Sequence, residues 1–200
     1  MNRMILAAVL AFAAAPALAA PVAYTLDPAH TQTTFTVDRF GFTTIMGAFT
    51  AAEGTIWIDE ADPASSRVEA FVTVASLYAG DPTREDHVKG PRWLNGAVNP
   101  TIRFVSTKVV PTGSTTADVT GDFTLNGVTR PVTFKVALNK IGKAPGSGKQ
   151  SAGFTITGSV QRRDFGIGAA LPPGLIGETV DIRIEALGVS AMPVLTPAAT

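Results

Sequence analysis

Apolar and polar residues alternate along most of this chain, and a period of two restricts the folds that it can adopt. In the segment PVTFKVALN, Val132, Phe134, Val136 and Leu138 fall on one side of an extended backbone. Many residues of these segments are β-branched or aromatic, which suits strands. The pattern predicts about eight half-buried strands. They lie within residues 33–38, 47–60, 66–76, 101–106, 118–126, 131–139, 153–161 and 180–187.

Short turns separate these segments. Asn126-Gly127 stands between two alternating runs and is a strong indicator of a hairpin. Asp62-Pro63 and residues 111–113 mark other turns. Strands with one apolar face each, joined by hairpins and without parallel crossovers, indicate an all-β fold, either an antiparallel barrel or a sandwich. An eight-stranded barrel can pack solid or enclose one ligand, and the alternation alone does not decide between these alternatives.

The most charged stretch, GDPTREDHVKGPRWLN, predicts the one helix of the fold. Asp81 is a good N-cap, and a proline follows it at the first helical position. Glu85 and Lys89 stand four residues apart in the favourable order, and Gly90 ends the pattern. We therefore expect a short helix over residues 82–89, between the third and fourth strands, followed by Trp93 and Leu94 as an apolar plug.

The first nineteen residues have the features of a secretory signal peptide. A positive charge at Arg3 precedes an apolar run, and Ala17-Leu18-Ala19 is a cleavage motif. We expect a periplasmic protein that starts at Ala20, with a domain over residues 20–188 and a flexible tail over 189–200. The 16 basic and 16 acidic residues give no net charge that would attract nucleic acid, and the absence of cysteine excludes thiol catalysis. We expect no stable membrane insertion.

Two histidines and one arginine are the residues with candidate chemistry. His87 is interpreted as a rim charge, with ligand contact and catalysis as the alternatives. Neither His87 nor His30 belongs to a metal-binding spacing, so we expect no metal and no cofactor. Arg162 continues the inward parity of its strand, where an isolated charge would be costly. It should pair with Asp164, Asp86 or Glu85, or contact a ligand headgroup, unless a bulge breaks the parity.

Several segments, in chain order, resemble motifs of the YceI-like, polyisoprenoid-binding family. Residues 27–31, DPAHT, resemble its opening D-x-x-H-S, and residues 84–88, REDHV, resemble R-D-x-H-L. Residues 121–132, GDFTLNGVTRPV, closely resemble its G-D-L-T-x-x-G-V-T-R-P-V hairpin, and residues 162–166 resemble R-S-D-F-G. The resemblance covers residues 24–187. The chain departs from the family pattern at Thr31, Arg39, Arg92 and Leu94, which concerns the headgroup end more than the tunnel.

The resemblance implies an exported, lipocalin-like, eight-stranded antiparallel β-barrel that binds a long isoprenoid chain in an internal tunnel, without catalysis. It places the helix and Trp93-Leu94 over the barrel opening. The polar residues expected to bind the ligand or to lie at the rim are His30, Arg84, His87, Arg162 and Asp164. The residues expected to line the tunnel are Phe35, Val37, Phe49, Val72, Val74, Trp93, Leu94, Phe104, Phe123, Phe134, Phe154 and Ile156.

Three functions are compatible with the sequence. The leading hypothesis is a carrier or binding protein for an isoprenoid lipid of the polyprenyl or quinone type, and a homodimer is compatible with it. The second is a stress-response or interaction module whose barrel is filled by its own side chains. The third is a lipid-modifying enzyme with His30 or His87 as the base. A hollow interior distinguishes the first hypothesis from the second.

Overall fold

The computed structural model describes residues 20–191. The predicted signal peptide and residues 192–200 of the predicted tail lie outside the described residues. The last strand runs to Ser190, so the start of the predicted tail is part of the barrel. Val189 is paired with Thr25 on one side and with Ser151 on the other. The prediction of a loose tail is therefore wrong at Val189 and Ser190, because strand pairing holds both residues in the barrel although their sequence shows no alternation.

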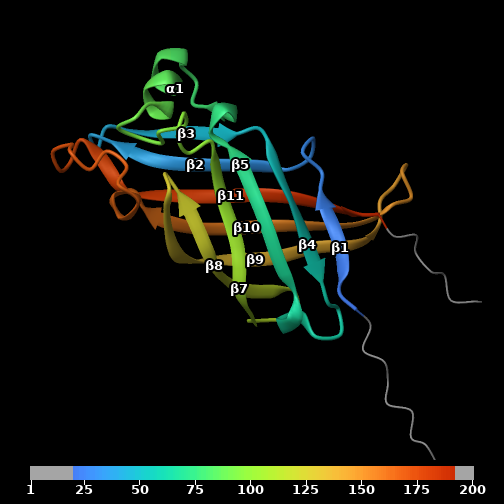
Figure 1. Ribbon diagram of the computed structural model, residues 1–200. Helices are drawn as coiled ribbons and strands as arrows, with labels where there is room; N and C mark the ends of the chain where they lie inside the picture. The colour runs from blue at the N-terminus through green and yellow to red at the C-terminus, as the bar shows by residue number, and fades with distance from the viewer. Residues whose placement is uncertain (1–19, 192–200) are drawn as a thin grey trace, which may run out of the picture.

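Strands dominate the described part of the chain, together with one α-helix and three short 3-10 helices (Figure 1). The strands are β1 Val22–Leu26, β2 Gln32–Arg39, β3 Thr43–Phe49, β4 Ala52–Ile58, β5 Arg67–Thr73, β6 Leu77–Tyr78, β7 Thr101–Pro111, β8 Thr116–Leu125, β9 Val128–Lys143, β10 Gln150–Gln161 and β11 Ile176–Ser190. The helices are α1 Pro82–Lys89, η1 Pro63–Ser65, η2 Val74–Ser76 and η3 Arg162–Phe165.

The strands form a closed antiparallel barrel, which decides between the two predicted architectures. Going around the wall, the order is β1, β4, β5, β7, β8, β9, β10 and β11, and β11 pairs with β1 to close it. The other three strands extend strands of this wall. Strand β2 pairs with β11 and extends β1, β3 pairs with β2 and extends β4, and β6 pairs with β3 and extends β5. Eight strands therefore surround the axis, although the backbone breaks three of them into two segments each.

The predicted position of the helix, between the third and fourth strands, is wrong, because α1 follows β6. The sequence prediction treats residues 47–60 as one strand and includes neither β1 nor the two-residue β6. In the structure, Thr50 and Ala51 separate β3 from β4. Across this break the chain changes neighbours, since β3 pairs with β2 and β4 pairs with β1. Alternation continues through such a corner, so the period of two does not reveal it.

The bounds predicted for the helix are confirmed. The side chain of Asp81 accepts a hydrogen bond of 2.8 Å from the backbone N–H of Arg84, and Gly90 is the C-cap. None of the helix residues is buried, so α1 adds little to the core. The chain then turns back: the backbone N–H of Leu94 donates to the carbonyl of Val88, and the Leu94 side chain is buried. Helix α1 thus stands outside one end of the barrel (Figure 1).

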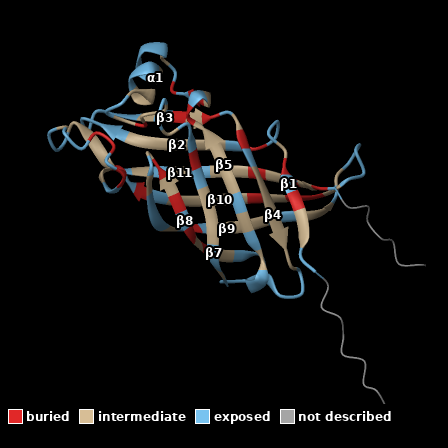
Figure 2. Ribbon diagram, in the orientation of Figure 1, coloured by how far each residue is buried: buried red, intermediate tan, exposed pale blue. Residues whose placement is uncertain are grey.

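The inward side chains form two apolar clusters instead of one continuous core. The first lies toward α1 and includes Phe123 and Phe165, whereas the second lies along β1, β10 and β11 and includes Tyr24 and Phe154. Other inward apolar residues, such as Phe35 and Ile182, pack against the first cluster and are only half-buried. Figure 2 shows long half-buried stretches in the middle of β2 and β11. Apolar side chains that face inward and still retain accessible surface are the mark of a hollow barrel.

Candidate ligand-binding cavity

A cavity of about 620 Å³ occupies the barrel interior. Its lining comes from strands on all sides of the wall, with α1 and the loop that follows η3, and is predominantly apolar. Ile156 packs against both apolar clusters, which places it midway along the cavity. Of the residues predicted to line a tunnel, ten do so: Phe35, Val37, Phe49, Val72, Trp93, Leu94, Phe104, Phe123, Phe134 and Ile156.

The other two predicted lining residues, Val74 and Phe154, lie beside the cavity instead of facing it. Val74 is buried in the first cluster because the strand parity of β5 ends at Thr73 and Val74 begins the 3-10 helix η2. Phe154 is buried in the second cluster, where it packs with Tyr24 and Leu26 of β1. Phe154 thus closes the interior at the end of the barrel away from α1, whereas Val74 packs at the end toward α1.

Glycines on neighbouring strands provide the space in which several cavity-facing phenylalanine rings lie. A Cβ added at Gly158 would stand 2.5 Å from Cδ1 of Phe134, and one added at Gly121 would stand 2.5 Å from the Phe104 ring. The two rings meet edge to face, with centroids 5.3 Å apart. Because each ring lies over a neighbouring strand's backbone, it leaves the centre of the barrel open.

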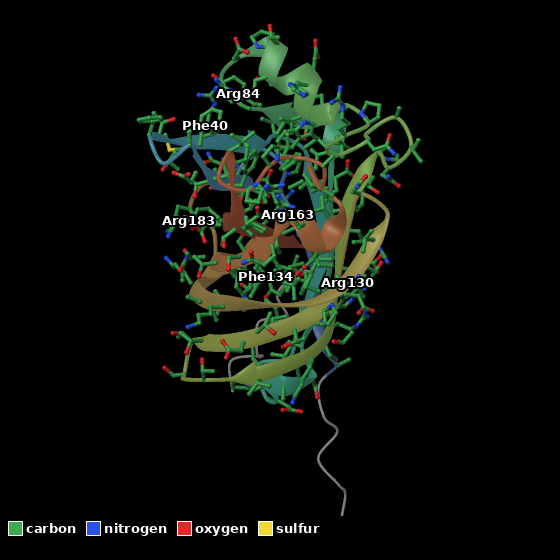
Figure 3. The ribbon with its side chains drawn as sticks, turned by 90° about the vertical axis from the view of Figure 1, so that its left-hand side faces the viewer. Phe40, Arg84, Arg130, Phe134, Arg163 and Arg183 are labelled. Atoms are coloured by element: carbon green, nitrogen blue, oxygen red, sulfur yellow. The ribbon has the colours of Figure 1, made fainter. Side chains whose placement is uncertain are left out.

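The mouth of the cavity lies between α1, the β2–β3 turn and the loop that follows η3. Arg39 and Phe40 come from the turn, and Arg84 and His87 come from α1. Figure 3 shows Phe40 and Arg84 at the same end of the molecule. Arg84 donates from Nη1 to the carbonyl of Ala79 at 2.6 Å, which fixes its guanidinium beside the opening. His87 meets the ring of Trp93 edge to face, with centroids 5.8 Å apart.

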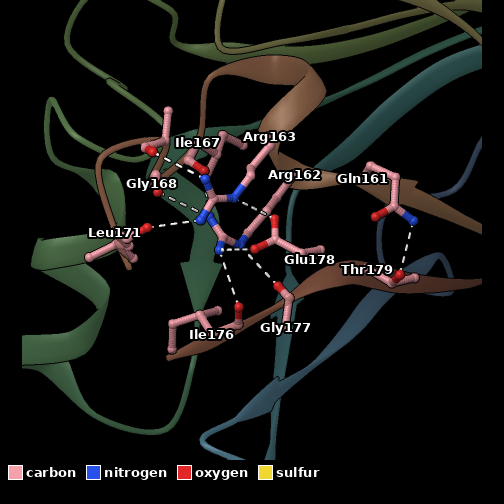
Figure 4. Close-up of polar contacts among 11 residues, drawn as sticks. Gln161, Arg162, Arg163, Ile167, Gly168, Leu171, Ile176, Gly177, Glu178 and Thr179 are labelled. Atoms are coloured by element: carbon pink, nitrogen blue, oxygen red, sulfur yellow. Dashed lines mark hydrogen bonds and ion pairs between the residues drawn. The ribbon is translucent and has the colours of Figure 1, made fainter. Parts of the chain in front are cut away.

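Arg162 is buried as predicted, with 2% of its surface exposed, but its partners differ from the predicted ones. Nε donates to Gly177 O, and Nη1 donates to Ile167 O and Gly168 O. Nη2 donates to Ile176 O and to a carboxylate oxygen of Glu178, each about 3 Å away (Figure 4).

All five N–H donors of Arg162 are therefore engaged. The predicted pairing with Asp164, Asp86 or Glu85 is wrong, since the charge partner is Glu178 on β11. No donor remains for a ligand headgroup, so Arg162 acts as a structural residue. It binds carbonyls on both sides of residues 169–175 and so holds the loop that forms one side of the mouth.

Glu178 and Arg163 complete this polar cluster, and sequence reasoning assigned neither of them. Arg163 forms an ion pair with Glu178 of 2.7 Å and donates from Nη2 to the carbonyl of Leu171 at 2.8 Å (Figure 4). One carboxylate thus receives two guanidinium groups. Glu178 stands at the start of β11 without a motif around it, so only its three-dimensional position reveals its role.

The sequence pattern of the YceI-like domain matches residues 24–187. The chain belongs to the YceI-like family. A UPF0312 protein of Pseudomonas putida (strain W619) is 37% identical over 176 residues, which cover 88% of this chain and 90% of the relative. A UPF0312 protein of Pseudomonas fluorescens (strain SBW25) is 39% identical over 160 residues, covering 80% of this chain and 81% of the relative.

Solved structures share the fold of this YceI-like protein. BcnA of Burkholderia cenocepacia superposes with a TM-score of 0.73 at 23% identity, covering 81% of this chain and 98% of BcnA. A polyisoprenoid binding domain from Saccharophagus degradans superposes with a TM-score of 0.64 at 12% identity, covering 84% of this chain and 99% of that domain. At these identities the likeness shows the fold.

Two of the YceI-like motifs and the segment that follows α1 meet around the same end of the barrel. The side chain of Asn126, in the β8–β9 hairpin, donates to the carbonyl of Phe165 in η3 at 3.0 Å. Asn99, in the segment that follows α1, donates to the side chain of Asn126 at 3.3 Å. Asn126 and Gly127 both have positive φ, as the predicted tight hairpin requires. These contacts tie the motifs into one frame around the cavity mouth.

Two residues predicted as rim or ligand contacts, His30 and Asp164, are exposed and do not line the cavity of the YceI-like barrel. His30 lies in the β1–β2 turn, where Nδ1 is 2.7 Å from Oδ2 of Asp27. This hydrogen bond and the backbone N–H of Ala29 lower the pKa of the Asp27 carboxyl. The pair stabilises a turn remote from α1, so the two histidines do not form one site.

The structure also identifies lining residues that the sequence prediction omitted. Val180, Ile182 and Ile184 of β11 face the cavity, and their alternation was a sufficient indication. Phe40 and Leu175 lie in turns, where no parity applies. Within residues 20–191, no cluster of three or more His, Cys, Asp or Glu side chains could hold a metal ion, and no helix has the length and apolar character to span a bilayer.

Proposed function

We propose that this YceI-like protein is an exported, non-catalytic binding protein or carrier for a long-chain isoprenoid lipid of the polyprenyl or quinone type. The observation that carries the proposal is the apolar cavity of about 620 Å³ inside the barrel. A barrel filled by its own side chains would lack this space. The volume lies within the range of roughly 300–1,000 Å³ that is usual for small-molecule sites. The polyisoprenoid binding domain of Saccharophagus degradans, which shares the fold, supports the same ligand class.

The chemistry of the lining favours a hydrocarbon chain over a polar ligand. Each Å² of apolar surface removed from water contributes about 25 cal/mol before the cost of association. Rings held against neighbouring strands, such as Phe104 and Phe134, provide a preformed wall, which reduces the ordering cost on binding. Branched, flexible isoprene units suit a lining of aromatic and aliphatic side chains. The affinity should therefore depend mainly on chain burial.

The charged part of such a lipid would lie at the mouth. Arg84 is exposed there, and one of its five N–H donors, on Nη1, is used for the carbonyl of Ala79. Arg39 lines the mouth from the opposite side. A phosphate or a quinone carbonyl between these side chains would accept charge-assisted hydrogen bonds. Arg162 contributes no such contact, since its donors are engaged.

An uptake experiment with a cavity-blocking variant tests this proposal. Delipidated protein without its signal sequence is mixed with a polyprenyl phosphate or with ubiquinone, and the lipid that co-elutes in gel filtration is quantified. Ile156→Trp places a larger side chain midway along the cavity, and Thr157→Trp adds the same side chain at the next, outward-facing position of β10. We expect near-stoichiometric uptake by the wild type and by Thr157→Trp, and at least a severalfold loss for Ile156→Trp.

Thermal unfolding of each variant shows whether the barrel is intact. A wild-type protein that takes up neither lipid would contradict the proposed function. Equal uptake by Ile156→Trp and Thr157→Trp, with both variants folded, would place the lipid outside the barrel.

A further inference from the structure

The tip of the β2–β3 hairpin exposes large apolar side chains beside the cavity mouth. Phe42 is 88% exposed, Met46 is 73% exposed, and Phe40 and Tyr78 are exposed as well. Met46 lies on the outer face of β3, and Tyr78 of β6 is paired with Ala48, the next outward residue of β3. These four residues, here called the hairpin patch, leave only Val98 and Val110 as other large exposed apolar residues within the described chain.

The conformation of the turn makes an aromatic residue at this tip unexpected. The backbone N–H of Phe42 donates to the carbonyl of Arg39, and both central residues of the turn, Phe40 and Gly41, have positive φ. Asn, Asp and Gly are the usual residues in such turns, and a bulky side chain there is unfavourable. Phe40 therefore does not serve the stability of the turn, and its exposed neighbour Phe42 adds nothing to the core.

The hairpin patch is continuous with the interior of the barrel. Phe40 is exposed and also lines the cavity, and Ile45 on the same hairpin faces inward. Within residues 20–191, the outer edge of β3 is paired only at Ala48 and Phe49, and the rest of this edge has no neighbouring strand. An apolar chain could pass along this side, over Phe40, from the exterior to the cavity.

The charged groups around the patch favour an anionic partner surface. The guanidinium of Arg39 lies over the ring of Phe40, 4.5 Å from its centroid, and Arg84 stands on the facing helix. Two of the nearby acids are held at the backbone: Asp38 accepts from the N–H of Gly41, and Asp81 accepts from the N–H of Arg84 at the start of α1, where the helix dipole offsets its charge. Exposed aromatic residues with cations beside them are typical of peripheral binding to anionic bilayers.

We infer that the hairpin patch docks reversibly on the surface of a bilayer that contains anionic lipids. The docked protein presents the cavity mouth to the membrane, so that the isoprenoid chain enters and leaves without exposure to water. This inference rests on the proposed function, because it assigns the surface through which the same cavity is loaded. The side chains are too few to span the bilayer, so the attachment is shallow.

Vesicle flotation tests the docking surface. Vesicles of phosphatidylethanolamine and phosphatidylglycerol are mixed with the wild type or with the double variant Phe42→Ser/Met46→Ser. The control is Val110→Ser, an exposed apolar residue near the end of β7 and outside the hairpin patch. We expect the wild type and Val110→Ser to float with the vesicles and the double variant to bind about tenfold more weakly. Vesicles of phosphatidylcholine alone should bind the wild type less, because the contribution of Arg39 and Arg84 is lost.

A second readout separates the docking surface from the cavity. In the absence of vesicles, the double variant should take up ubiquinone from solution as well as the wild type does. Transfer of ubiquinone between two vesicle populations should be slower with the double variant. Equal flotation of the wild type and the double variant would overturn the docking inference. If sedimentation also showed a wild-type dimer that the double variant does not form, the patch would be a dimer interface instead. Failure of the wild type to take up any isoprenoid would instead contradict the proposed function.

Discussion

At the scale of single residues, Arg162 shows how a buried charge can be mistaken for a binding group. Its inward direction follows from the parity of β10, and the sequence predicted its burial. The prediction could not identify its partners, since four of the five hydrogen bonds go to backbone carbonyls and the fifth goes to Glu178. Carbonyl groups are present at every position, so their convergence on one guanidinium is visible only in the folded chain.

Replacement of Arg162 by lysine should therefore affect stability much more than ligand choice. A lysine cannot supply five N–H donors in a planar arrangement, and it would leave buried carbonyls without partners. We expect Arg162→Lys to lower the free energy of unfolding by roughly 3 to 5 kcal/mol, as measured by urea denaturation. Arg130→Lys, at an exposed position, should change it by less than about 0.5 kcal/mol.

The ratio of affinities for a polyprenyl phosphate and for ubiquinone should be the same in Arg162→Lys as in the wild type. A selective loss of phosphate affinity, with the unfolding free energy unchanged, would show that Arg162 binds the headgroup after all.

At the scale of elements, a glycine on one strand makes room for an aromatic ring on the neighbouring strand. The ring of Phe134 on β9 lies over Gly158 of β10, and that of Phe104 on β7 lies over Gly121 of β8. Glycines within strands indicated that bends or open space were needed, but the sequence could not say which ring each glycine accommodates. That matching depends on strand register, which the alternation does not specify.

Gly158→Ala should disturb this packing while Gly153→Ala on the same strand should not. A Cβ at position 158 would collide with the Phe134 ring, whereas a Cβ at position 153 would meet no atom within 4 Å. We expect Gly158→Ala to lower the free energy of unfolding by about 1 to 3 kcal/mol and to weaken ubiquinone binding, because the displaced ring enters the cavity. Denaturation and equilibrium binding of both variants check this, and equal effects of the two would contradict it.

The helix α1 marks both the strength and the limit of sequence reasoning about elements. Its bounds follow from local chemistry, namely the Asp81 cap, a proline at the first turn and the stop at Gly90, and all are observed. Its predicted place in the strand order was wrong, because a break at Thr50 and Ala51 divides one continuous alternating pattern into two strands. Local signals define an element, whereas the order of elements around a barrel depends on which strands pair.

At the scale of the whole molecule, alternation predicted a wall with an apolar inner face, and the structure shows that wall closed into a barrel. Whether the barrel is hollow could not be predicted, because the same residues serve a packed core and a ligand cavity. The answer depends on how ring volume is distributed around the axis, with Phe104 and Phe134 held against neighbouring strands and Phe154 filling one end. The mouth depends on segments with no pattern, such as the Phe40 turn.

Native mass spectrometry of protein purified from the periplasm, followed by organic extraction, would show whether the barrel holds an isoprenoid lipid. We predict that the mature chain starts at Ala20 and carries close to one isoprenoid lipid per barrel, released on extraction. Protein that carries no such lipid, and that also acquires none when a polyprenyl phosphate or ubiquinone is added, would contradict the assignment of the cavity as an isoprenoid site.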